Sequence, residues 1–482
     1  MGLLKDFAPQ RVLKHLEDLL AIPHGSGHEA ALGDHILALA RRRSLPACRD
    51  GAGNILVRVP ASPEGKGAPP VLVQGHMDMV LAQEPEVDRD LTVQPVELVL
   101  EGSVLRADRT TLGADNGVGL CTMMALMEAD DLPHPPLELL FTVEEETGFT
   151  GILNFDMGQL KARRMIQMDC GDPDCLVMGA AGGAQYTLSR TCGICPGGAG
   201  LRVRVSGLRG GHSGLEMGKN RGSALDLCGR LLAALCQQMP VRLGLLTTPN
   251  QGSSIPQEAA LSFLPPEGRR EEAREICQSC FCQFHEELLE TEPDFSASLE
   301  DCPLEETASE ADTQALASFL LLLPYEALRR DTEHPAWVLC SALLTQAGCT
   351  GGRFFGKYAI RANLNSYRDA AALRFQQLCR LTGVEAEQTA PFLPAWPQRR
   401  DSPLRQVCLD AFARRFGRPM SVEVEHGTVE VGILVGAIPD MDAVGFAPKS
   451  RGAHTTREHL YLETVEPFWQ LFCDVLERLC QE

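Results

Sequence analysis

The chain has 482 residues, of which 44% are hydrophobic and 22% are charged, and its formal net charge is −20. This length exceeds the size at which single hydrophobic cores stop growing, so we expect two or more domains. The composition is that of a globular protein and excludes a disordered or fibrous chain. The 64 acidic residues outnumber the 44 basic ones, and no basic block is long enough to follow a phosphate backbone, so we expect no nucleic-acid partner.

The first residues, MGLLKDFAPQ, lack the basic segment and the apolar run of a signal peptide, and no later run reaches the roughly 18 apolar residues of a membrane helix. We therefore expect a cytoplasmic protein without membrane contact. The 18 cysteines are scattered along the chain, which is typical of reduced thiols rather than of a disulfide framework. The pairs Cys192/Cys195 and Cys277/Cys280 leave a structural zinc site open, although packed thiols are the commoner outcome.

Two amphipathic helices are predicted at the start of the chain from apolar residues at helical spacing. Ser26, followed three residues later by Glu29, predicts a capping box for the second helix. Residues 54–59 and 71–74 then predict two strands. Because only the Pro- and Gly-rich loop PASPEGKGAPP separates them, we expect a hairpin-like pair.

The second of these strands leads into His76 and Asp78 in the stretch VLVQGHMD. The two residues are two positions apart and lie on the same side of an extended chain. A neutral imidazole is a common zinc ligand, and a nearby carboxylate can fix its tautomer. Such a short motif also occurs by chance, so by itself it is a weak metal signal.

The stretch TTLGADNGVGL leads into a methionine-rich helix. Its glycines do not follow the GxGxxG order and no Lys-Ser/Thr follows, which argues against phosphate binding. Asp115 lies in the turn before the helix. A helix N-cap and a metal ligand are both open for this residue.

A predicted strand at residues 137–143 runs directly into three carboxylates, Glu144–Glu146. Adjacent carboxylates at a strand end are costly unless a positive charge lies among them, and a metal ion is one source of that charge. An exposed acidic loop is the alternative. A short strand at residues 165–168 ends in the same way at Asp169, and strand ends are where α/β sheets hold their sites.

From about residue 182 the pattern changes to half-buried strands and long helices, which predicts an inserted α+β domain. The predicted strands are 185–189, 201–207 and 358–364, and the predicted helices are 223–239, 271–289 and 369–381. In this domain His212 lies in the glycine-rich turn GLRGGHSG, where a solvent-exposed histidine is the simplest interpretation. The Pro-rich segment PFLPAWPQRRDSPL predicts the return linker.

The last segment returns to an α/β pattern, with helices predicted at residues 403–416 and 463–479. Between them, the loop APKSRGAHTTREHL contains His454. A single loop histidine is usually a surface residue. Here it is the fifth metal-competent group at a predicted element end, which favours a ligand role.

Taken together, the motifs HMD, GADNG, EEETG, MDCGD and AHTT resemble those of the co-catalytic zinc peptidases related to glutamate carboxypeptidase and aminoacylase, and among them most closely the aminoacyl-histidine dipeptidases. The resemblance spans nearly the whole chain, including SSIPQEA, SRGAH and the segment around Arg361. It implies an α/β fold, with a catalytic domain made of a central mixed sheet flanked by helices in residues 1–183 and 396–482. An inserted α+β lid domain is implied for residues 184–395.

The resemblance also implies two divalent metal ions, Zn in the first place and Mn or Co as alternatives. Five residues match its ligand positions: His76 and Asp169 on one ion, Glu146 and His454 on the other, and Asp115 bridging the two. The family has a cis peptide bond after the bridging aspartate, so we expect one between Asp115 and Asn116.

Four further residues match positions with a role in that family. Asp78 would orient His76, and Glu145 would be the general base that takes a proton from water and gives it to the leaving amine. His212 would reach the substrate carbonyl, and Arg361 would grip a substrate carboxylate with its guanidinium group. Whether His212 acts in its own chain or across a homodimer is open.

The departures from the family pattern lie mainly in the lid. Gly218 replaces a second histidine, Ser223 replaces an asparagine, and Ser253 stands where asparagine is usual, while AHSPDE becomes AHTTRE. The ligand positions are kept. We therefore predict a metal-dependent dipeptidase that acts on short unblocked peptides, of the Xaa-His type or broader. An N-acyl-amino-acid or other amide hydrolase, and a non-catalytic metal-binding protein, are the alternatives.

Overall fold

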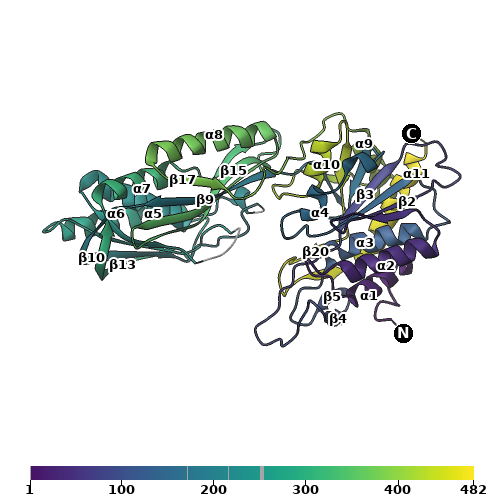
Figure 1. Ribbon diagram of the computed structural model, residues 1–482, viewed down its shortest axis with the longest axis horizontal. Helices are drawn as coiled ribbons and strands as arrows, with labels where there is room; N and C mark the ends of the chain where they lie inside the picture. The colour runs from purple at the N-terminus through teal and green to yellow at the C-terminus, as the bar shows by residue number, and fades with distance from the viewer. Residues whose placement is uncertain (1, 171, 215, 250–253, 482) are drawn as a thin grey trace. The chain divides into compact units, whose positions relative to one another are not determined.

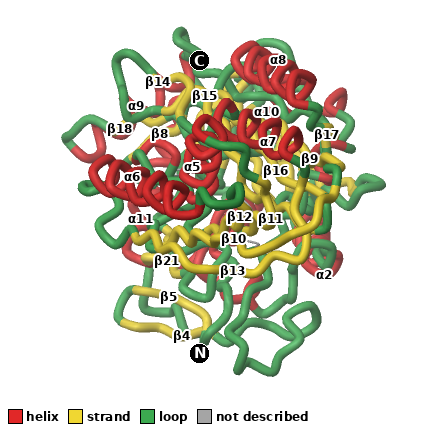
Figure 2. Tube along the Cα trace, turned by 90° about the vertical axis from the view of Figure 1, so that its left-hand side faces the viewer, coloured by secondary structure: helices red, strands yellow, loops and turns green. Residues whose placement is uncertain are grey.

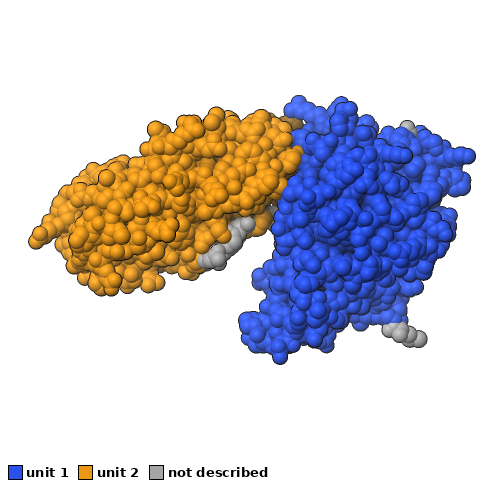
Figure 3. All heavy atoms as spheres, in the orientation of Figure 1, with its two compact units in different colours: residues 1–179, 396–424, 430–482 blue, residues 180–395, 425–429 orange. Residues whose placement is uncertain are grey.

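The computed structural model describes residues 2–170, 172–214, 216–249 and 254–481. The chain forms two compact units (Figure 3). Unit 1 comprises residues 1–179, 396–424 and 430–482, and unit 2 comprises residues 180–395 and 425–429. Unit 2 therefore begins at Ala180 rather than at residue 184, and it takes up a short late segment that the sequence places in the catalytic domain.

Unit 1 is built on an eight-stranded mixed sheet. Its order is β1 (Ala47–Arg49), β2 (Ile55–Val59), β6 (Leu137–Thr142), β3 (Val71–His76), β7 (Arg164–Gln167), β19 (Asp442–Gly445), β8 (Cys175–Val177) and β18 (Ser421–Glu423). β3 runs parallel to both β6 and β7. Both β3 and β6 are buried along their whole length, which explains their nearly unbroken apolar sequences.

Helices flank this sheet, and in Figure 1 α1, α2 and α3 lie along one side while α9 and α10 lie along the other. The helices of unit 1 are α1 (Gln10–Leu20), α2 (Ala30–Arg42), α3 (Ala114–Met127), α4 (Thr150–Leu153), α9 (Pro403–Phe416), α10 (Val431–Ala437) and α11 (Val465–Leu479), with 3-10 turns η1 (Met157–Gln159) and η3 (Leu462–Thr464). A second sheet has the order β20 (Ser450–Arg451), β21 (His459–Tyr461), β5 (Val104–Ala107) and β4 (Leu98–Glu101).

The predicted hairpin-like pair is wrong. β6 lies between β2 and β3, antiparallel to β2 with Phe141 opposite Ile55, and parallel to β3 with Thr142 beside His76. Two strands that follow each other in sequence need not be neighbours, because the apolar faces of both are buried equally well with a third strand between them. The loop composition alone does not reveal that strand.

The predicted capping box is also wrong, because α2 begins at Ala30 without a side-chain cap. The Ser26 hydroxyl instead donates to Asp78 Oδ2 at 2.8 Å. Glu29 Oε1 accepts a hydrogen bond from the Glu144 amide at 3.1 Å. Both side chains thus hold the loops that follow β3 and β6 rather than the helix.

Unit 2 contains a nine-stranded antiparallel sheet covered by a layer of four helices (Figure 2). The strand order is β13 (Ser296–Ala308), β10 (Ile194–Ser206), β12 (Ala259–Leu264), β11 (Arg242–Thr247), β15 (Val338–Thr350), β16 (Arg353–Ala362), β9 (Gly182–Thr191) and β17 (Glu385–Gln388), with β14 (Ala327–Arg330) also on β15. The helices are α5 (Ala224–Gln238), α6 (Arg270–Leu288), α7 (Glu310–Leu322) and α8 (Asn365–Thr382), preceded by the 3-10 turn η2 (Met217–Lys219).

The core of unit 2 lies between this sheet and its helices. Tyr358 of β16 stacks on Phe375 of α8 with ring centroids 4.5 Å apart, and both side chains are buried. None of the 18 cysteines, which all lie among the described residues, forms a disulfide, and Cys277 and Cys280 are buried thiols on α6. In the described part of the chain, no helix is long and apolar enough to cross a membrane.

Candidate metal centre

Unit 1 gathers the five predicted metal ligands at one place. His76 is the last residue of β3, the acidic stretch Glu144–Glu146 follows β6, and Asp169 follows β7 shortly after its last residue. Because these strands are parallel, their carboxyl ends meet at the same edge of the sheet. Asp115 comes from the start of α3, and His454 comes from the loop between β20 and β21.

The carboxylate of Asp115 lies between two histidines. Its Oδ1 is 3.1 Å from His76 Nε2, and its Oδ2 is 3.4 Å from His454 Nε2. Asp169 Oδ1 is 3.4 Å from His76 Nε2, and Glu146 Oε1 is 2.7 Å from His454 Nε2. The Asp115 carboxylate therefore lies between two groups of side chains, His76 with Asp169 and His454 with Glu146.

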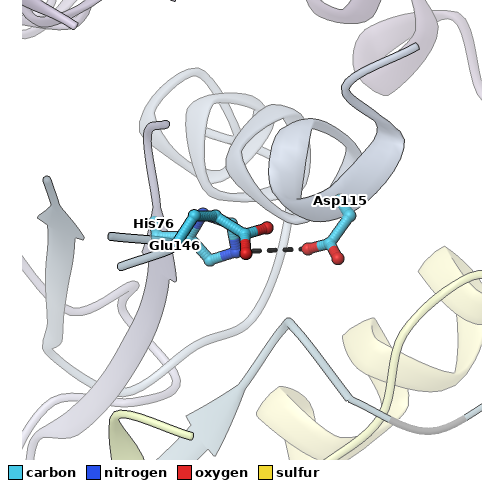
Figure 4. Close-up of side chains that lie close together, drawn as sticks. All are labelled: His76, Asp115 and Glu146. Carbon is cyan, nitrogen blue, oxygen red and sulfur yellow. Dashed lines mark hydrogen bonds and ion pairs between the residues drawn. The ribbon is translucent and has the colours of Figure 1, made fainter. Parts of the chain in front are cut away.

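Figure 4 shows His76, Asp115 and Glu146 pointing toward one another, and their ligand atoms all lie within 4.8 Å of each other. Nitrogen and carboxylate oxygen donors at this spacing suit a divalent cation such as Zn²⁺. His76 is buried, and the Glu146 side chain is only 8% exposed. The Asp115 and His454 side chains are 21% and 51% exposed, so the site is open to solvent at His454, and its carboxylates give it an excess of negative charge.

The electrostatics show how strongly these groups interact. Burial and the nearby charge of Asp115 raise the pKa of Asp169 well above its usual range. Burial also acts to raise the pKa of Asp115, but hydrogen bonds with His454 and His76 outweigh it and hold that pKa below its usual range. Hydrogen bonds with Asp115 and Glu146 raise the pKa of His454 to about 11. Such clusters of perturbed groups are typical of functional sites.

Asp78 contacts the ring nitrogen of His76 that does not face Asp115. The Nδ1 atom of His76 is 2.9 Å from the Asp78 carbonyl oxygen and 3.4 Å from its Oδ1. The Asp78 carboxylate also accepts hydrogen bonds from the amides of Glu145 at 3.0 Å and Glu146 at 3.1 Å. Asp78 thus fixes the imidazole mainly through its backbone carbonyl, and it fixes the turn that carries both glutamates through its buried carboxylate.

Glu145 sits in this turn beside the ligand group. Burial raises the pKa of Glu145 well above its usual range, the charge of His76 opposes this, and the nearby carboxylates of Asp169 and Glu430 add to the rise. A carboxyl group with a raised pKa is suited to accept a proton near neutral pH.

The predicted cis peptide bond is confirmed between Asp115 and Asn116. Gly113 occupies the N-cap position of α3, so Asp115 lies within the first turn, at a kink where its own backbone is extended (φ −87°, ψ 110°). The Asn116 side-chain amide donates to the Met168 carbonyl at 2.8 Å and to Asp169 Oδ1 at 3.3 Å. Asn116 therefore ties the Asp115 segment to the end of β7.

Two buried glutamates near the site are absent from the sequence-based predictions. Glu430 Oε2 accepts a hydrogen bond from Thr142 Oγ1 at 2.7 Å, and burial raises the Glu430 pKa to about 7. Glu458 Oε2 accepts from the amides of Leu112 and Gly113. The alternating residues of SVEVEHGTVEVG conceal the helix that begins after Glu430, whereas Glu458 stands within the AHTTRE motif and could have been singled out there.

Arg361 and His212 belong to unit 2. Arg361 Nη1 donates to Thr428 Oγ1 at 2.9 Å, whereas its Nε is buried without a hydrogen-bond partner. Among the residues that the structure describes, no carboxylate lies within ion-pair distance of Arg361, and burial lowers its pKa. His212 is exposed in its turn, where its Nδ1 accepts a hydrogen bond from the Gly214 amide at 3.3 Å.

A buried histidine beside Arg361 is also absent from the sequence-based predictions. His426 Nε2 is 2.7 Å from Ser341 Oγ, and its Nδ1 is 3.3 Å from Asn363 Oδ1. Burial, together with the positive charge of Arg361, lowers the pKa of His426 to about 3. The imidazole is therefore neutral at physiological pH, and Arg361 is the charged group of this cluster.

The three residues of the predicted lid domain that depart from the family pattern lie in different structural settings. Gly218 lies in η2, where its carbonyl accepts a hydrogen bond from Arg330 at 3.2 Å. Ser223 is buried immediately before α5. Ser253 lies outside the described residues.

The model of peptidase family M20/M25/M40 matches residues 72–478, a range that contains all five predicted ligands. The chain belongs to this family. It is 27% identical over 486 residues to the cytosol non-specific dipeptidase of Escherichia coli, covering 99% of both chains. The resemblance predicted from the motifs and the predicted α/β fold class are therefore confirmed, and the chain is a hydrolase of the metallopeptidase class.

Solved structures agree with this assignment. The aminoacylhistidine dipeptidase of Vibrio alginolyticus superposes with a TM-score of 0.89 at 27% identity, covering 99% of this chain and 98% of that one. The aminopeptidase PepT of Bacillus cereus superposes with a TM-score of 0.56 at 15% identity, covering 98% and 99%. The second similarity shows that the fold is shared at much lower sequence identity.

The buried His426 predicts a pH dependence of stability. Its pKa is about 3 in the folded protein and about 6.5 in an unfolded chain. Between these values the unfolded chain binds the additional proton, so the free energy of unfolding falls as the pH is lowered from about 6.5 toward 3. We expect this residue to remove about 2 kcal/mol between pH 7 and pH 5, measured by urea unfolding.

The variant His426→Gln cannot bind that proton and should lose less stability over the same pH interval. His285→Gln is the control, because His285 is exposed on α6 of the same unit. Its pH dependence should match that of the wild type. An identical pH dependence in the wild type and His426→Gln would contradict the prediction.

Proposed function

We propose that the chain is a dipeptidase that hydrolyses the amide bond of short unblocked peptides with water activated at two divalent metal ions, Zn in the first place and Mn or Co as alternatives. The observation that carries the proposal is the Asp115 carboxylate, which faces His76 on one side and His454 on the other. The two dipeptidase relatives that match nearly the whole chain support a dipeptide substrate. We propose a cytoplasmic location, as for the Escherichia coli relative.

In this proposal His76 and Asp169 hold one ion, Glu146 and His454 hold the other, and Asp115 bridges them. When bound, the two ions supply Lewis acidity that activates a water and polarises the scissile carbonyl. Three carboxylates among five ligands offset much of the charge of two dications. The crowding that raises the pKa of Asp169 in the metal-free protein supports a site that requires added positive charge.

Glu145 is the general base. It takes a proton from the attacking water and delivers it to the amine that leaves. Asp78 holds the Glu145 amide and the His76 ring at once, so it keeps the base and the first ligand in a fixed relation. Glu144, the preceding acid, has no role in the chemistry.

Unit 2 is the lid domain and binds the substrate. Arg361 carries a buried, unpartnered Nε, and a guanidinium group binds a carboxylate through two parallel hydrogen bonds. The C-terminal carboxylate of a peptide supplies that partner. His212 reaches the substrate carbonyl, either within its own chain or from the other chain of a homodimer.

A substrate panel tests the proposal. Purified protein loaded with Zn or Mn is assayed on Xaa-His dipeptides, on dipeptides without histidine and on N-acyl amino acids. We expect hydrolysis of dipeptides, loss of turnover after chelation, and recovery when the metal is restored. Turnover of acylated amino acids alone would replace the dipeptidase by an amide hydrolase, and bound metal without any turnover would indicate a non-catalytic protein.

Substitution of the general base gives a second test. Glu145→Gln should lower kcat by about 100- to 10,000-fold, because proton transfer by a positioned base contributes a factor of this size. Its metal content, measured by elemental analysis, should equal that of the wild type. Glu144→Gln is the matched control and should keep both metal and turnover. A Glu145 variant with full metal and full turnover would show that the base is another residue.

Removal of the carboxylate clamp gives a third test. A hydrogen bond to a charged group contributes about 1.5 to 3 kcal/mol, so Arg361→Met should raise KM for a free dipeptide by about 10- to 100-fold. The same dipeptide with an amidated C-terminus should bind the wild type and the variant equally. Arg353→Met, on an exposed position of the same strand, is the control. Equal KM values of wild type and Arg361→Met for the free dipeptide would exclude the clamp.

A further inference from the structure

We propose that Glu458 is a positioning residue that fixes the backbone of the bridging Asp115, so that the loop carrying His454 sets two ligand positions of the metal centre at once. This inference rests on the two-metal function proposed above. Glu458 is not a predicted ligand. Its carboxylate binds backbone amides, among them the amide of Asp115, and the inference concerns this backbone contact.

Both carboxylate oxygens of Glu458 accept hydrogen bonds from the same short segment. Its Oε2 accepts hydrogen bonds from the amides of Leu112 at 2.8 Å and Gly113 at 3.0 Å, and its Oε1 accepts from the amide of Asp115 at 3.1 Å. The side chain is only 2% exposed. Three charge-assisted hydrogen bonds in a buried setting are each about twice as strong as neutral ones.

The backbone amides that Glu458 binds lie where the chain is too irregular to supply carbonyl partners of its own. Gly113 has a left-handed backbone (φ 83°), and Asp115 and Asn116 depart from helical geometry before α3 becomes regular. Amides at a helix start have no carbonyl partner within the helix. The carboxylate of Glu458 accepts the hydrogen bonds of these amides, and its negative charge is also favoured at the positive end of a helix. The orientation of the Asp115 carboxylate thus depends on an acid more than 300 positions away in sequence.

The same loop carries His454, four positions before Glu458. The other side of the loop is tied by Arg451, whose Nη1 and Nη2 donate to the two carboxylate oxygens of Asp172 at 2.8 Å and 2.7 Å. Asp172 follows Asp169 by three positions. The loop from Arg451 to Glu458 therefore joins the segments that carry Asp169 and Asp115, and it adds the His454 imidazole between them.

This geometry predicts how the site responds when Glu458 is changed. Because Asp115 Oδ1 faces His76 and Oδ2 faces His454, a shift of its backbone alters both halves of the site together. In Glu458→Gln one carboxylate oxygen becomes an NH₂ group, which opposes at least one of the amide donors instead of accepting from it. Asp115 then loses its fixed position while its own side chain is unchanged.

Unit 1 offers a matched control. Glu138 is a second buried glutamate whose carboxylate accepts hydrogen bonds from two backbone amides, that of Lys161, which both oxygens share, and that of Ala162; its Oε1 also lies 4.0 Å from Arg58 Nε. It lies near the amino end of β6, away from the edge at which the ligands gather. Glu138→Gln thus removes the same type of interaction without touching a ligand segment.

The test measures metal binding directly. Zn²⁺ is titrated calorimetrically into the metal-free wild type, Glu458→Gln and Glu138→Gln, absorption spectra are recorded with Co²⁺, and kcat and KM are determined on a dipeptide. For Glu458→Gln we expect an affinity lower by about 10- to 100-fold for at least one ion, an altered Co²⁺ spectrum, and a fall in kcat larger than the change in KM. For Glu138→Gln we expect a lower melting temperature with wild-type affinity and spectrum.

Glu458→Asp provides a second variant, which keeps the charge but is one methylene shorter, and its affinity should lie between those of the wild type and Glu458→Gln. Wild-type Zn²⁺ affinities and Co²⁺ spectra in both Glu458 variants would overturn the positioning role, even if their melting temperatures fall. A wild-type protein that binds fewer than two ions would instead overturn the two-metal function on which this role rests.

Discussion

The constraint on which the rest of the structure depends is the concentration of buried negative charge around Asp115. Carboxylates packed this closely repel one another and lose their hydration, so each needs a positive partner or a proton. The imidazoles of His76 and His454 meet part of that need: burial acts to lower the pKa of His76, but the charge of Asp169 outweighs it, and hydrogen bonds with Asp115 and Glu146 raise the pKa of His454. Metal ions have to displace these protons, so metal binding and proton release are linked.

The fold holds these charges together by holding the backbone around them. Asp78 accepts hydrogen bonds from the amides of Glu145 and Glu146, and Glu458 accepts from the amides before α3. Glu29 does the same for Glu144. The segments that carry Asp115 and Glu144–Glu146 are thus each fixed by another acid that binds their amides, so the ligand carboxylates of these segments are oriented through the backbone.

Local sequence patterns predicted the strands of the centre and the residues at their ends, because burial on both faces requires apolar runs and a polar residue marks where each run stops. The helix at Pro403–Phe416 has the predicted bounds, where Ser402 caps its start and Gly417 its end. The position of β6 between β2 and β3 was not predictable in this way, since strand neighbours are chosen by tertiary burial. Glu430 and His426 were missed for a related reason, because their partners are distant in sequence, whereas the AHTTRE motif contains Glu458 but does not reveal its partners before α3.

Gly218, where the resemblance places a histidine, lies in unit 2, whereas the five predicted ligands lie in unit 1. A Cβ at this glycine would lie 3.2 Å from the Ala336 carbonyl oxygen and 3.3 Å from Val338 Cγ2, tighter than ordinary contact. A histidine, which the related dipeptidases typically have here, would require these neighbours to move. The packing around Gly218 is therefore fitted to a residue without a side chain, and the buried cluster elsewhere in unit 2 pairs Arg361 with a neutral His426. Under the carboxylate-clamp role proposed for Arg361, a guanidinium group beside a neutral imidazole favours a substrate with a free carboxylate.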